Sequence, residues 1–248
     1  MTEIKNFLFT YENIMELGRG GAEFFLKHCL KETERKGFFT VVLSGGDTPY
    51  RLYTALASNE FRERVPWDKV HLFWGDERCV GPEHPESNFG LAYRALISRV
   101  DIPQQNVHRI KGELGPAEAA LDYEGEIRRF FGVTEPYKAP VFDMVFLGMG
   151  DDGHTLSLYP DTKALSEEER LVTENYVEKL GAYRVTMTLP LVNNASFVIF
   201  LVSGKGKSGA LKQVLSDAKA GYPAQLVRPR TGEVRWLIDR GAASELAR

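Results

Sequence analysis

Short apolar runs alternate along the chain with longer segments whose apolar residues recur at helical spacing. The first helical pattern covers residues 13–36, and an apolar, β-rich run follows at 38–43. The next helix is expected at 50–57. Pro49 suits its first position and Thr48 suits its cap. This part of the chain therefore predicts a strand, a glycine loop and a helix.

The same order recurs through the rest of the chain. Further strands are expected at 70–74, 107–110, 141–147, 171–177, 184–189, 197–202 and 234–238. Further helices are expected from Ser87 or Asn88 to Val100, from Pro116 to Gly132, at 207–218 and briefly at the C-terminus. Such alternation is typical of βαβ units. It predicts an α/β fold whose mainly parallel sheet is covered by helices on both faces. No linker, repeat or low-complexity segment interrupts it, so one domain over residues 1–248 is expected.

The composition is that of an ordinary globular protein. Of the 248 residues, 43% are apolar and 26% are charged, and the formal net charge of −3 gives no sign of a nucleic-acid partner. No apolar run approaches the roughly 20 residues of a membrane span, and the N-terminal residues lack the layout of a signal peptide. Cys29 and Cys79 are expected as free thiols, which suits a cytoplasmic location. The sequence indicates no oligomeric state and is compatible with a monomer.

Several of the predicted strands end in polar or glycine-rich segments, and parallel sheets bind ligands at the carboxyl ends of their strands. The first such segment is Ser44-Gly-Gly-Asp-Thr-Pro49. Its backbone amides precede a helix N-terminus, where they lack helical partners and the helix dipole favours negative charge. The segment is therefore a candidate phosphate site. A plain tight turn is the alternative, and the Asp47 carboxylate argues against a phosphate close to its own side chain.

Three charged residues, Asp76, Glu77 and Arg78, follow the strand expected at 70–74. Their carboxylates could orient a guanidinium group or a water molecule, and the guanidinium could bind phosphate or carboxylate oxygens through two donors. Taken alone, a solvated turn explains this triplet better. A metal site that includes His84 is disfavoured, because a lone histidine is a weak metal signal.

The segment Gly204-Lys-Gly-Lys-Ser-Gly209 follows a strand, opens a helix and matches the spacing of a dinucleotide-binding fingerprint. A nucleotide-binding P-loop would need glycine where Leu201 stands. A dinucleotide fold would place an acid about 20 residues further on, where this chain has Arg228 and Arg230. A nicotinamide cofactor stays open only if these arginines hold a phosphorylated ribose. Otherwise the two lysines indicate an anionic partner or a solvated surface.

The segment Gly148–Pro160 carries the most distinctive chemistry. It follows an apolar run, turns on three glycines and places His154 behind two carboxylates, Asp151 and Asp152. Its glycines match a second dinucleotide spacing, but the two carboxylates would repel a pyrophosphate. A histidine beside a carboxylate can accept a proton at neutral pH, and the carboxylate can fix its tautomer. His154 is therefore a candidate base, with a helix-capping or buried structural histidine as the alternative.

The segments that match a known family extend over nearly the whole chain and in the expected order. They are Ser44-Gly-Gly-Asp-Thr-Pro49, Gly75-Asp-Glu-Arg78 with Ser87-Asn88, Gly148–Pro160, Arg184-Val-Thr-Met-Thr-Leu-Pro190, Gly204 to Lys207, Pro223-Ala224 and Trp236-Leu-Ile-Asp239. Together they resemble the 6-phosphogluconolactonases, in the superfamily that also holds the glucosamine-6-phosphate isomerases. The Asp-Gly-His-Thr block at Asp152 is the specific part of this resemblance.

The resemblance implies a Rossmann-like sheet shared with sugar-phosphate isomerases. It implies hydrolysis of 6-phospho-D-glucono-1,5-lactone to 6-phospho-D-gluconate in the oxidative pentose phosphate pathway, with neither cofactor nor metal. In this family's scheme His154 would activate water, and Asp152 would orient or tune it. The substrate-binding residues that it implies are Ser44, Gly45, Gly46, Thr48, Asp76, Arg78, Asn88, Arg184 and Lys207. Which basic residues bind the phosphate and which stabilise the oxyanion stays open.

Four positions depart from the family's pattern. The family usually has serine at Asp47, proline at Asp151, alanine at Leu156 and phenylalanine at Tyr159. The last two replacements keep apolar bulk. The two aspartates add negative charge near an anionic substrate, which argues against direct contact with it. An ion pair with a neighbouring basic group would reconcile each of them with that role.

Two other functions fit part of the pattern. The related glucosamine-6-phosphate deaminases have Asp-Glu-Tyr where this chain has Asp76-Glu-Arg78, and Ile-Ala-Phe-Asn where it has Thr155-Leu-Ser-Leu158. Both differences favour the lactonase. A non-catalytic sugar-phosphate sensor would share the fold, but no DNA-binding segment is recognisable and the candidate base is present.

Overall fold

The computed structural model describes residues 6–136, 138–216 and 221–246. Within them, the main feature is a sheet of seven strands in the order β1-β10-β9-β6-β2-β3-β5. From edge to edge these strands are β1 (Asn6–Tyr11), β10 (Glu233–Asp239), β9 (Phe197–Val202), β6 (Met144–Leu147), β2 (Phe39–Leu43), β3 (Val70–Trp74) and β5 (Val107–His108). Every pairing is parallel. The predicted parallel α/β sheet is confirmed.

The order of the strands fixes where a ligand should bind. From β2 the chain continues through β3 and β5 to one edge of the sheet, and from β6 it continues through β9 and β10 towards the other edge. The direction of winding therefore reverses between β2 and β6. In open parallel sheets the crevice outside such a reversal point is the usual ligand site. The segments that begin at Ser44 and Gly148 leave the sheet at this point.

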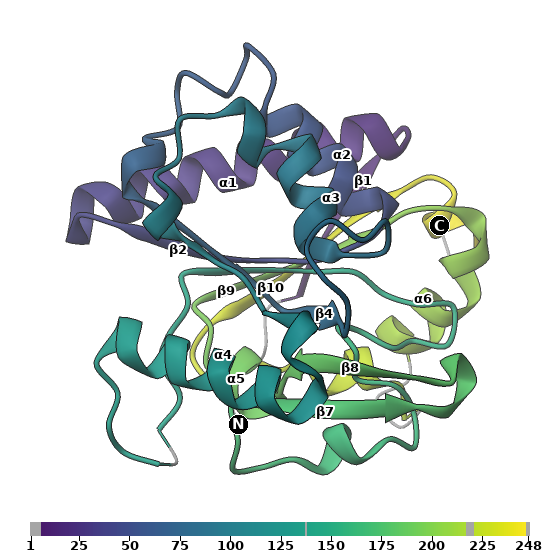
Figure 1. Ribbon diagram of the computed structural model, residues 1–248. Helices are drawn as coiled ribbons and strands as arrows, with labels where there is room; N and C mark the ends of the chain where they lie inside the picture. The colour runs from purple at the N-terminus through teal and green to yellow at the C-terminus, as the bar shows by residue number, and fades with distance from the viewer. Residues whose placement is uncertain (1–5, 137, 217–220, 247–248) are drawn as a thin grey trace.

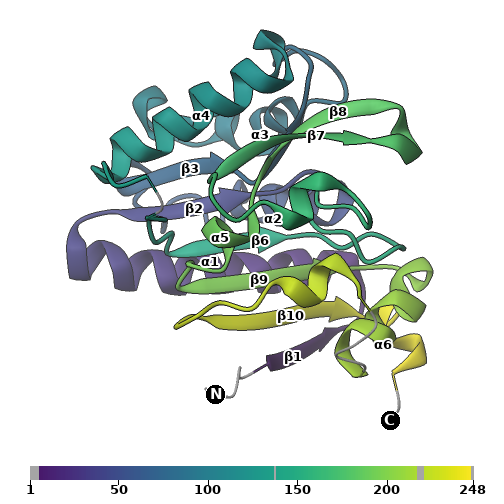
Figure 2. The same ribbon diagram turned by 90° about the horizontal axis from the view of Figure 1, so that it is seen from below.

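Helices cover both faces of the sheet, as predicted (Figure 1). One face carries α1 (Ile14–Lys36), α2 (Asp47–Leu56) and α3 (Asn88–Ala95). The other carries α4 (Pro116–Phe131) and the short α5 (Leu189–Val192), whereas α6 (Ser208–Ser216) lies beyond the carboxyl end of β9 (Figure 2). In the described part of the chain, no helix has both the length and the apolar character needed to cross a membrane.

A second, smaller sheet lies over one face of the first, and its strands are antiparallel (Figure 2). Its order is β4 (Asp76–Arg78), β8 (Ala182–Met187) and β7 (Val172–Val177). The strands expected at 171–177 and 184–189 therefore exist, but they do not join the parallel sheet. Because β7 and β8 are joined by a tight turn, they can only be antiparallel neighbours. Helix α4 packs against this sheet.

Short 3-10 helices connect the main elements. They lie at Trp67–Lys69, Ile97–Arg99, Gln104–Asn106, Gly112–Leu114, Lys163–Ser166, Glu178–Leu180, Lys205–Lys207, Pro223–Leu226 and Ala242–Glu245. The last of these stands where a short C-terminal helix was expected. The helix expected at 207–218 is described from Ser208 to Ser216, and positions 217 and 218 lie outside the described residues.

Several predicted boundaries were wrong for local reasons. Helix α2 begins at Asp47, and its N-cap is Gly46 rather than Thr48, because the backbone turns at Gly46 with φ of 103°. Helix α3 starts after Ser87, whose Oγ accepts from the Gly90 amide at 3.0 Å, but it ends at Ala95 rather than near residue 100. Strand β1 was missed, because an isolated run near the start of the chain gives little signal by itself.

Candidate active site

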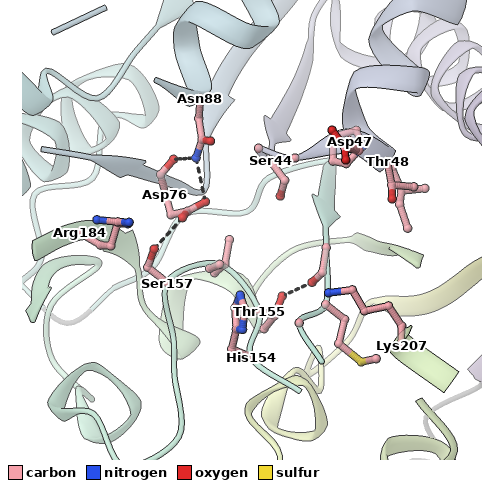
Figure 3. A pocket seen from close by; sticks show the side chains of 18 of the residues that line it. Ser44, Asp47, Thr48, Asp76, Asn88, His154, Thr155, Ser157, Arg184 and Lys207 are labelled. Carbon is pink, nitrogen blue, oxygen red and sulfur yellow. Dashed lines mark hydrogen bonds between the residues drawn. The ribbon is translucent and has the colours of Figure 1, made fainter. Parts of the chain in front are cut away.

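The carboxyl ends of β9, β6, β2 and β3, which are neighbours in the sheet, meet at one cavity of about 510 Å³. All the predicted substrate-binding residues line this cavity, and so does His154. Asp152 does not line it and lies behind His154. Figure 3 shows His154 between Arg184 at one end of the cavity and Lys207 at the other. The structure thus brings together side chains that the sequence spreads over more than half of its length.

The glycine loop after β2 is fixed to its neighbours by hydrogen bonds. Ser44 Oγ donates to the Phe146 carbonyl at 2.7 Å, which ties the end of β2 to β6. The Tyr53 hydroxyl donates to the Ser44 carbonyl at 2.5 Å and accepts from the Ser44 amide at 3.1 Å. The Ser44 hydroxyl proton is therefore engaged inside the protein. The loop can contact a ligand through its free backbone amides.

Those amides belong to the N-terminus of α2. Its N-cap, Gly46, has no side chain, so no side chain caps the first turn. Gly45, Gly46 and Thr48 all line the cavity. Amides without helical partners, together with the helix dipole, make this end of the cavity suited to an anion. Asp47 is exposed, and the expected ion pair is not found, since no described residue pairs with it.

The two carboxylates of the Asp76–Arg78 triplet point to opposite faces, as side chains in a strand must. Glu77 turns away from the cavity and is 2% exposed. It accepts from the amides of Asn88 at 2.7 Å and Phe89 at 2.8 Å, which holds the N-terminus of α3. Burial raises the pKa of Glu77 above its ordinary value, against the lowering effect of these amide donors. Glu77 also accepts from the Arg78 backbone amide at 2.8 Å, so its carboxylate holds the backbone of this segment rather than the Arg78 guanidinium.

Asp76 faces the cavity and is held by two neighbours. Its Oδ2 accepts from Ser157 Oγ at 2.7 Å, and its carbonyl accepts from Asn88 Nδ2 at 2.9 Å. Ser157 comes from the segment after His154, so these contacts connect the end of β3 with the end of β6. Sequence reasoning did not single out Ser157. Its only signal was its place inside the segment Gly148–Pro160.

Arg78 and Arg184 lie directly opposite each other in the antiparallel pair of β4 and β8. Both line the cavity. The Arg78 guanidinium donates to the Glu86 carbonyl, and the Arg184 guanidinium donates to the Tyr183 carbonyl at 3.0 Å. Among the described residues, neither guanidinium has a carboxylate partner. Two positive charges on one wall form an anion-binding surface.

His154 is held by the turn that precedes it. Its Nδ1 is 2.5 Å from Asp152 Oδ1, and its amide donates to the same oxygen at 3.2 Å. The turn needs glycine at position 150, because a Cβ atom there would lie 2.1 Å from His154 Nδ1. With Nδ1 occupied by the carboxylate, Nε2 is the ring nitrogen left to act on a ligand.

Two further groups complete the surroundings of His154. The Tyr159 ring stacks on the imidazole with centroids 4.0 Å apart and an interplanar angle of 19°. Lys179 Nζ lies 2.9 Å from Asp152 Oδ2 and 3.8 Å from Asp151 Oδ1. The ion pair expected for Asp151 is therefore present. Lys179 itself was missed, since an isolated surface lysine has no sequence signature.

The charge state of Asp152 follows from these contacts. Burial alone would raise the pKa of its carboxyl group, but the hydrogen bonds from Lys179 and His154 outweigh burial. The pKa of Asp152 consequently lies below its ordinary value. The carboxylate is ionised at neutral pH and can stabilise a charged imidazole.

Lys207 forms the opposite end of the cavity from Arg184. The turn that carries it is fixed by Asp239, whose carboxylate accepts from the Gly204 amide at 3.0 Å and from the Ala242 amide at 2.7 Å. No carboxylate of the described residues pairs with Lys207. Its ammonium group is therefore available in this cavity to a ligand that carries negative charge.

The histidine that was considered for a metal site does not line the cavity. His84 is exposed on its loop, where its Nδ1 accepts from the Glu86 amide at 3.2 Å. Over residues 6–136, 138–216 and 221–246, no three His, Cys, Asp or Glu side chains come together in a way that could hold a metal ion.

Comparison with known proteins places this chain in a family. A family model described as glucosamine-6-phosphate isomerases/6-phosphogluconolactonase matches residues 13–236. The chain is similar to 6-phosphogluconolactonases of Nostoc sp. (45% identity, covering 86% of this chain and 87% of the relative) and Synechocystis sp. (43% identity, covering 87% and 88%). It is also similar to the solved 6-phosphogluconolactonase from Trypanosoma cruzi, with a TM-score of 0.86 and 27% identity over 99% of this chain and 98% of that one. The chain belongs to the family of glucosamine-6-phosphate isomerases and 6-phosphogluconolactonases.

Proposed function

We propose that the protein is a 6-phosphogluconolactonase, which hydrolyses 6-phospho-D-glucono-1,5-lactone to 6-phospho-D-gluconate in the oxidative pentose phosphate pathway. The observation that carries this proposal is a histidine and carboxylate couple placed between two separate basic ends of one cavity. The substrate has a matching layout, with a phosphate at one end and a reactive carbonyl at the other. Similarity to 6-phosphogluconolactonases over most of the chain supports the same activity.

The phosphate binds at the N-terminus of α2 in this proposal. Gly45, Gly46 and Thr48 line the cavity at this helix start, and Lys207 lines the same cavity. A helix N-terminus with a lysine beside it is a common way to hold a phosphate group. The exposed side chain of Asp47 stays outside this contact.

The reacting carbonyl then lies between His154 and the arginines of the small sheet. Burial and Asp76 raise the pKa of the Tyr159 phenol, whereas Arg184 and Arg78 lower it. The Tyr159 ring stacks on His154, and Tyr159, Arg78 and Arg184 line the same cavity. In this proposal the two cations stabilise the oxyanion that forms on the carbonyl oxygen.

The chemical steps follow from these positions. His154 Nε2 takes a proton from water as the water oxygen attacks the lactone carbonyl carbon. Negative charge moves to the carbonyl oxygen, where Arg78 and Arg184 stabilise it. Asp152 stabilises the imidazolium. When the tetrahedral intermediate collapses, the bond to the ring oxygen breaks and the imidazolium returns its proton to that oxygen. The product is the open-chain acid, and the base is restored.

A cytoplasmic location is proposed together with this activity. Cys29 and Cys79, the two cysteines of the chain, are both free thiols. Unpaired thiols suit a reducing compartment. The substrate proposed is a small phosphorylated sugar lactone, and a single chain carries every residue that the mechanism uses.

The test measures lactone loss above the spontaneous rate. The purified protein should accelerate it, and His154→Ala should lower kcat by about 100- to 10,000-fold while 6-phosphogluconate still binds. His84→Ala, at an exposed histidine outside the cavity, is the matched control and should leave the rate unchanged. Full activity in His154→Ala would refute the assigned base. Ammonia release from glucosamine 6-phosphate would instead indicate a deaminase, and tight binding with neither reaction would indicate a sensor.

A further inference from the structure

The two oxygens of the Asp152 carboxylate have different partners. Oδ1 accepts from the His154 amide and lies 2.5 Å from His154 Nδ1. Oδ2 accepts from Lys179 Nζ at 2.9 Å. The carboxylate therefore connects the candidate base to a cation that does not line the active-site cavity.

Lys179 reaches Asp152 from a distant part of the chain. It belongs to the 3-10 turn Glu178–Leu180 between β7 and β8, the hairpin that also carries Arg184. The neighbouring Leu180 lines the active-site cavity, whereas Lys179 and Asp152 line a second cavity of about 700 Å³. The ion pair thus ties the end of the hairpin to the turn that holds His154.

We propose that Lys179 is a positioning residue for the base, acting on His154 through Asp152; this inference rests on the proposed lactonase function. By holding Oδ2, Lys179 keeps Oδ1 aimed at Nδ1 and so keeps Nε2 directed at the substrate. By its positive charge, it also opposes protonation of the imidazole and limits how strongly Asp152 favours the imidazolium. Removing Lys179 should therefore loosen the geometry of the base and make it easier to protonate.

The ion pair is better suited to this function than to stabilising the fold. The Lys179 side chain is 58% exposed and that of Asp152 is 24% exposed. An ion pair with a solvent-exposed lysine contributes little to the free energy of unfolding. A mild change in catalysis and in its pH dependence, with an unchanged unfolding temperature, is thus the expected signature.

Other ionisable groups also act on His154, and they stay in place when Lys179 is replaced. On the histidine's own turn, Asp151 lies next to Asp152 in the sequence, and Tyr159 stacks on the ring from the segment that follows. The charged groups across the active-site cavity are Asp47, Asp76, Arg78, Arg184 and Lys207. Since these groups remain, a difference between the unmodified protein and a Lys179 variant reports the Lys179 charge and its contacts with Asp152 and Asp151.

The experiment compares Lys179→Met with Lys179→Arg and Lys163→Met. Lys163 lines the same second cavity and forms no ion pair with Asp152, which makes it the matched control. In Lys179→Met, kcat should fall about 10-fold with KM within roughly twofold, since a misplaced catalytic group slows the chemical step more than binding. The acidic limb of the pH profile of kcat/KM should move to higher pH by ~0.5 unit. Lys179→Arg should restore both quantities, and Lys163→Met should change neither.

An NMR titration of the His154 imidazole gives a readout that does not need activity. Its midpoint in Lys179→Met should lie above that of the unmodified protein by the same ~0.5 pH unit. An unchanged midpoint together with unchanged kcat would overturn the inference, and so would a loss of kcat that Lys179→Arg fails to restore. Failure of the proposed function can be told apart from failure of this inference. In that case the unmodified protein would lack lactonase activity, and the titration would still test the effect of Lys179 on His154.

Discussion

Arg78 of β4 and Arg184 of β8 stand directly opposite each other in an antiparallel strand pair, on the wall of the candidate active site. Like charges in such positions destabilise a sheet. Among the described residues no carboxylate forms an ion pair with either arginine. An anionic ligand would relieve this repulsion. The arginine pair is therefore expected to lower the stability of the free protein, and substrate binding is expected to remove that effect.

Replacing one member of this pair should separate binding from stability. In Arg184→Gln we expect 6-phosphogluconate to bind at least about 10-fold more weakly, because its carboxylate loses a charged donor. The free protein should unfold at the same or a slightly higher temperature, since the repulsion is gone. Calorimetric titration and thermal unfolding measure the two effects. Arg99→Gln, at an exposed arginine outside the cavity, should alter neither, and a clearly destabilised Arg184→Gln with normal binding would contradict the interpretation.

Lys207 should affect binding of the phosphate more than the chemical step. In Lys207→Met we expect KM to rise about 10-fold or more while kcat changes by only a few fold, because a contact kept from ground state to transition state contributes uniform binding. Steady-state kinetics with inorganic phosphate as a competitor measures this. Lys205→Met is the control, since Lys205 lies in the same turn but is exposed and does not line the cavity. A large fall in kcat with unchanged KM would instead place Lys207 at the reacting carbonyl.

Asp152→Asn should slow the reaction and shift its pH dependence in the direction opposite to Lys179→Met. Without the carboxylate the imidazolium loses its stabilising charge, so the acidic limb of kcat/KM should move to lower pH. We expect kcat to fall by about 10- to 1,000-fold, because an amide can also favour the wrong tautomer. The pH profile of the variant measures both. An acidic limb that moves to higher pH would show that Asp152 does not act on the base.

A histidine pair far from the active site should control stability in acid. His71 Nδ1 lies 3.2 Å from His108 Nε2, and His108 Nδ1 lies 2.9 Å from Glu126 Oε1. Burial, followed by the charges of His108 and Lys36, lowers the pKa of His71 from 6.5 to about 4. Between these two pH values the unfolded chain binds the proton and the folded protein does not. Stability should therefore be full above about pH 6.5 and fall as the pH drops towards 4.

The size of this effect is about 1 to 2 kcal/mol once partial solvent exposure of His71 is allowed for. Urea unfolding between pH 4 and 7 measures it. His71→Leu should flatten the slope over this range, whereas His84→Ala, at an exposed histidine, should leave the slope unchanged. An equally steep slope in His71→Leu would assign the acid sensitivity to other groups.

Much of the fold could be predicted because its signals are local. The fully apolar run at Phe197–Val202 indicates a buried strand wherever it lies, and Pro116 marks the start of α4 through the fixed backbone of proline. The substrate-binding residues predicted from the family resemblance all line one cavity, although their individual functions stay predictions. The boundary at α2 was wrong because the turn at Gly46, rather than a polar cap, starts that helix.

The segment around His154 shows what the sequence determines by itself and what depends on the tertiary structure. By itself the sequence determined that strands alternate with helices, that glycine and charged segments follow the strands, and that a histidine stands beside two carboxylates. Only the tertiary structure decided that Glu77 turns inward, that Arg78 faces Arg184 and that Lys179 holds Asp152. Those relations depend on strand register and on contacts between residues far apart in the chain. No periodic pattern in the sequence predicts these relations, because each is fixed by the packing of one element against another.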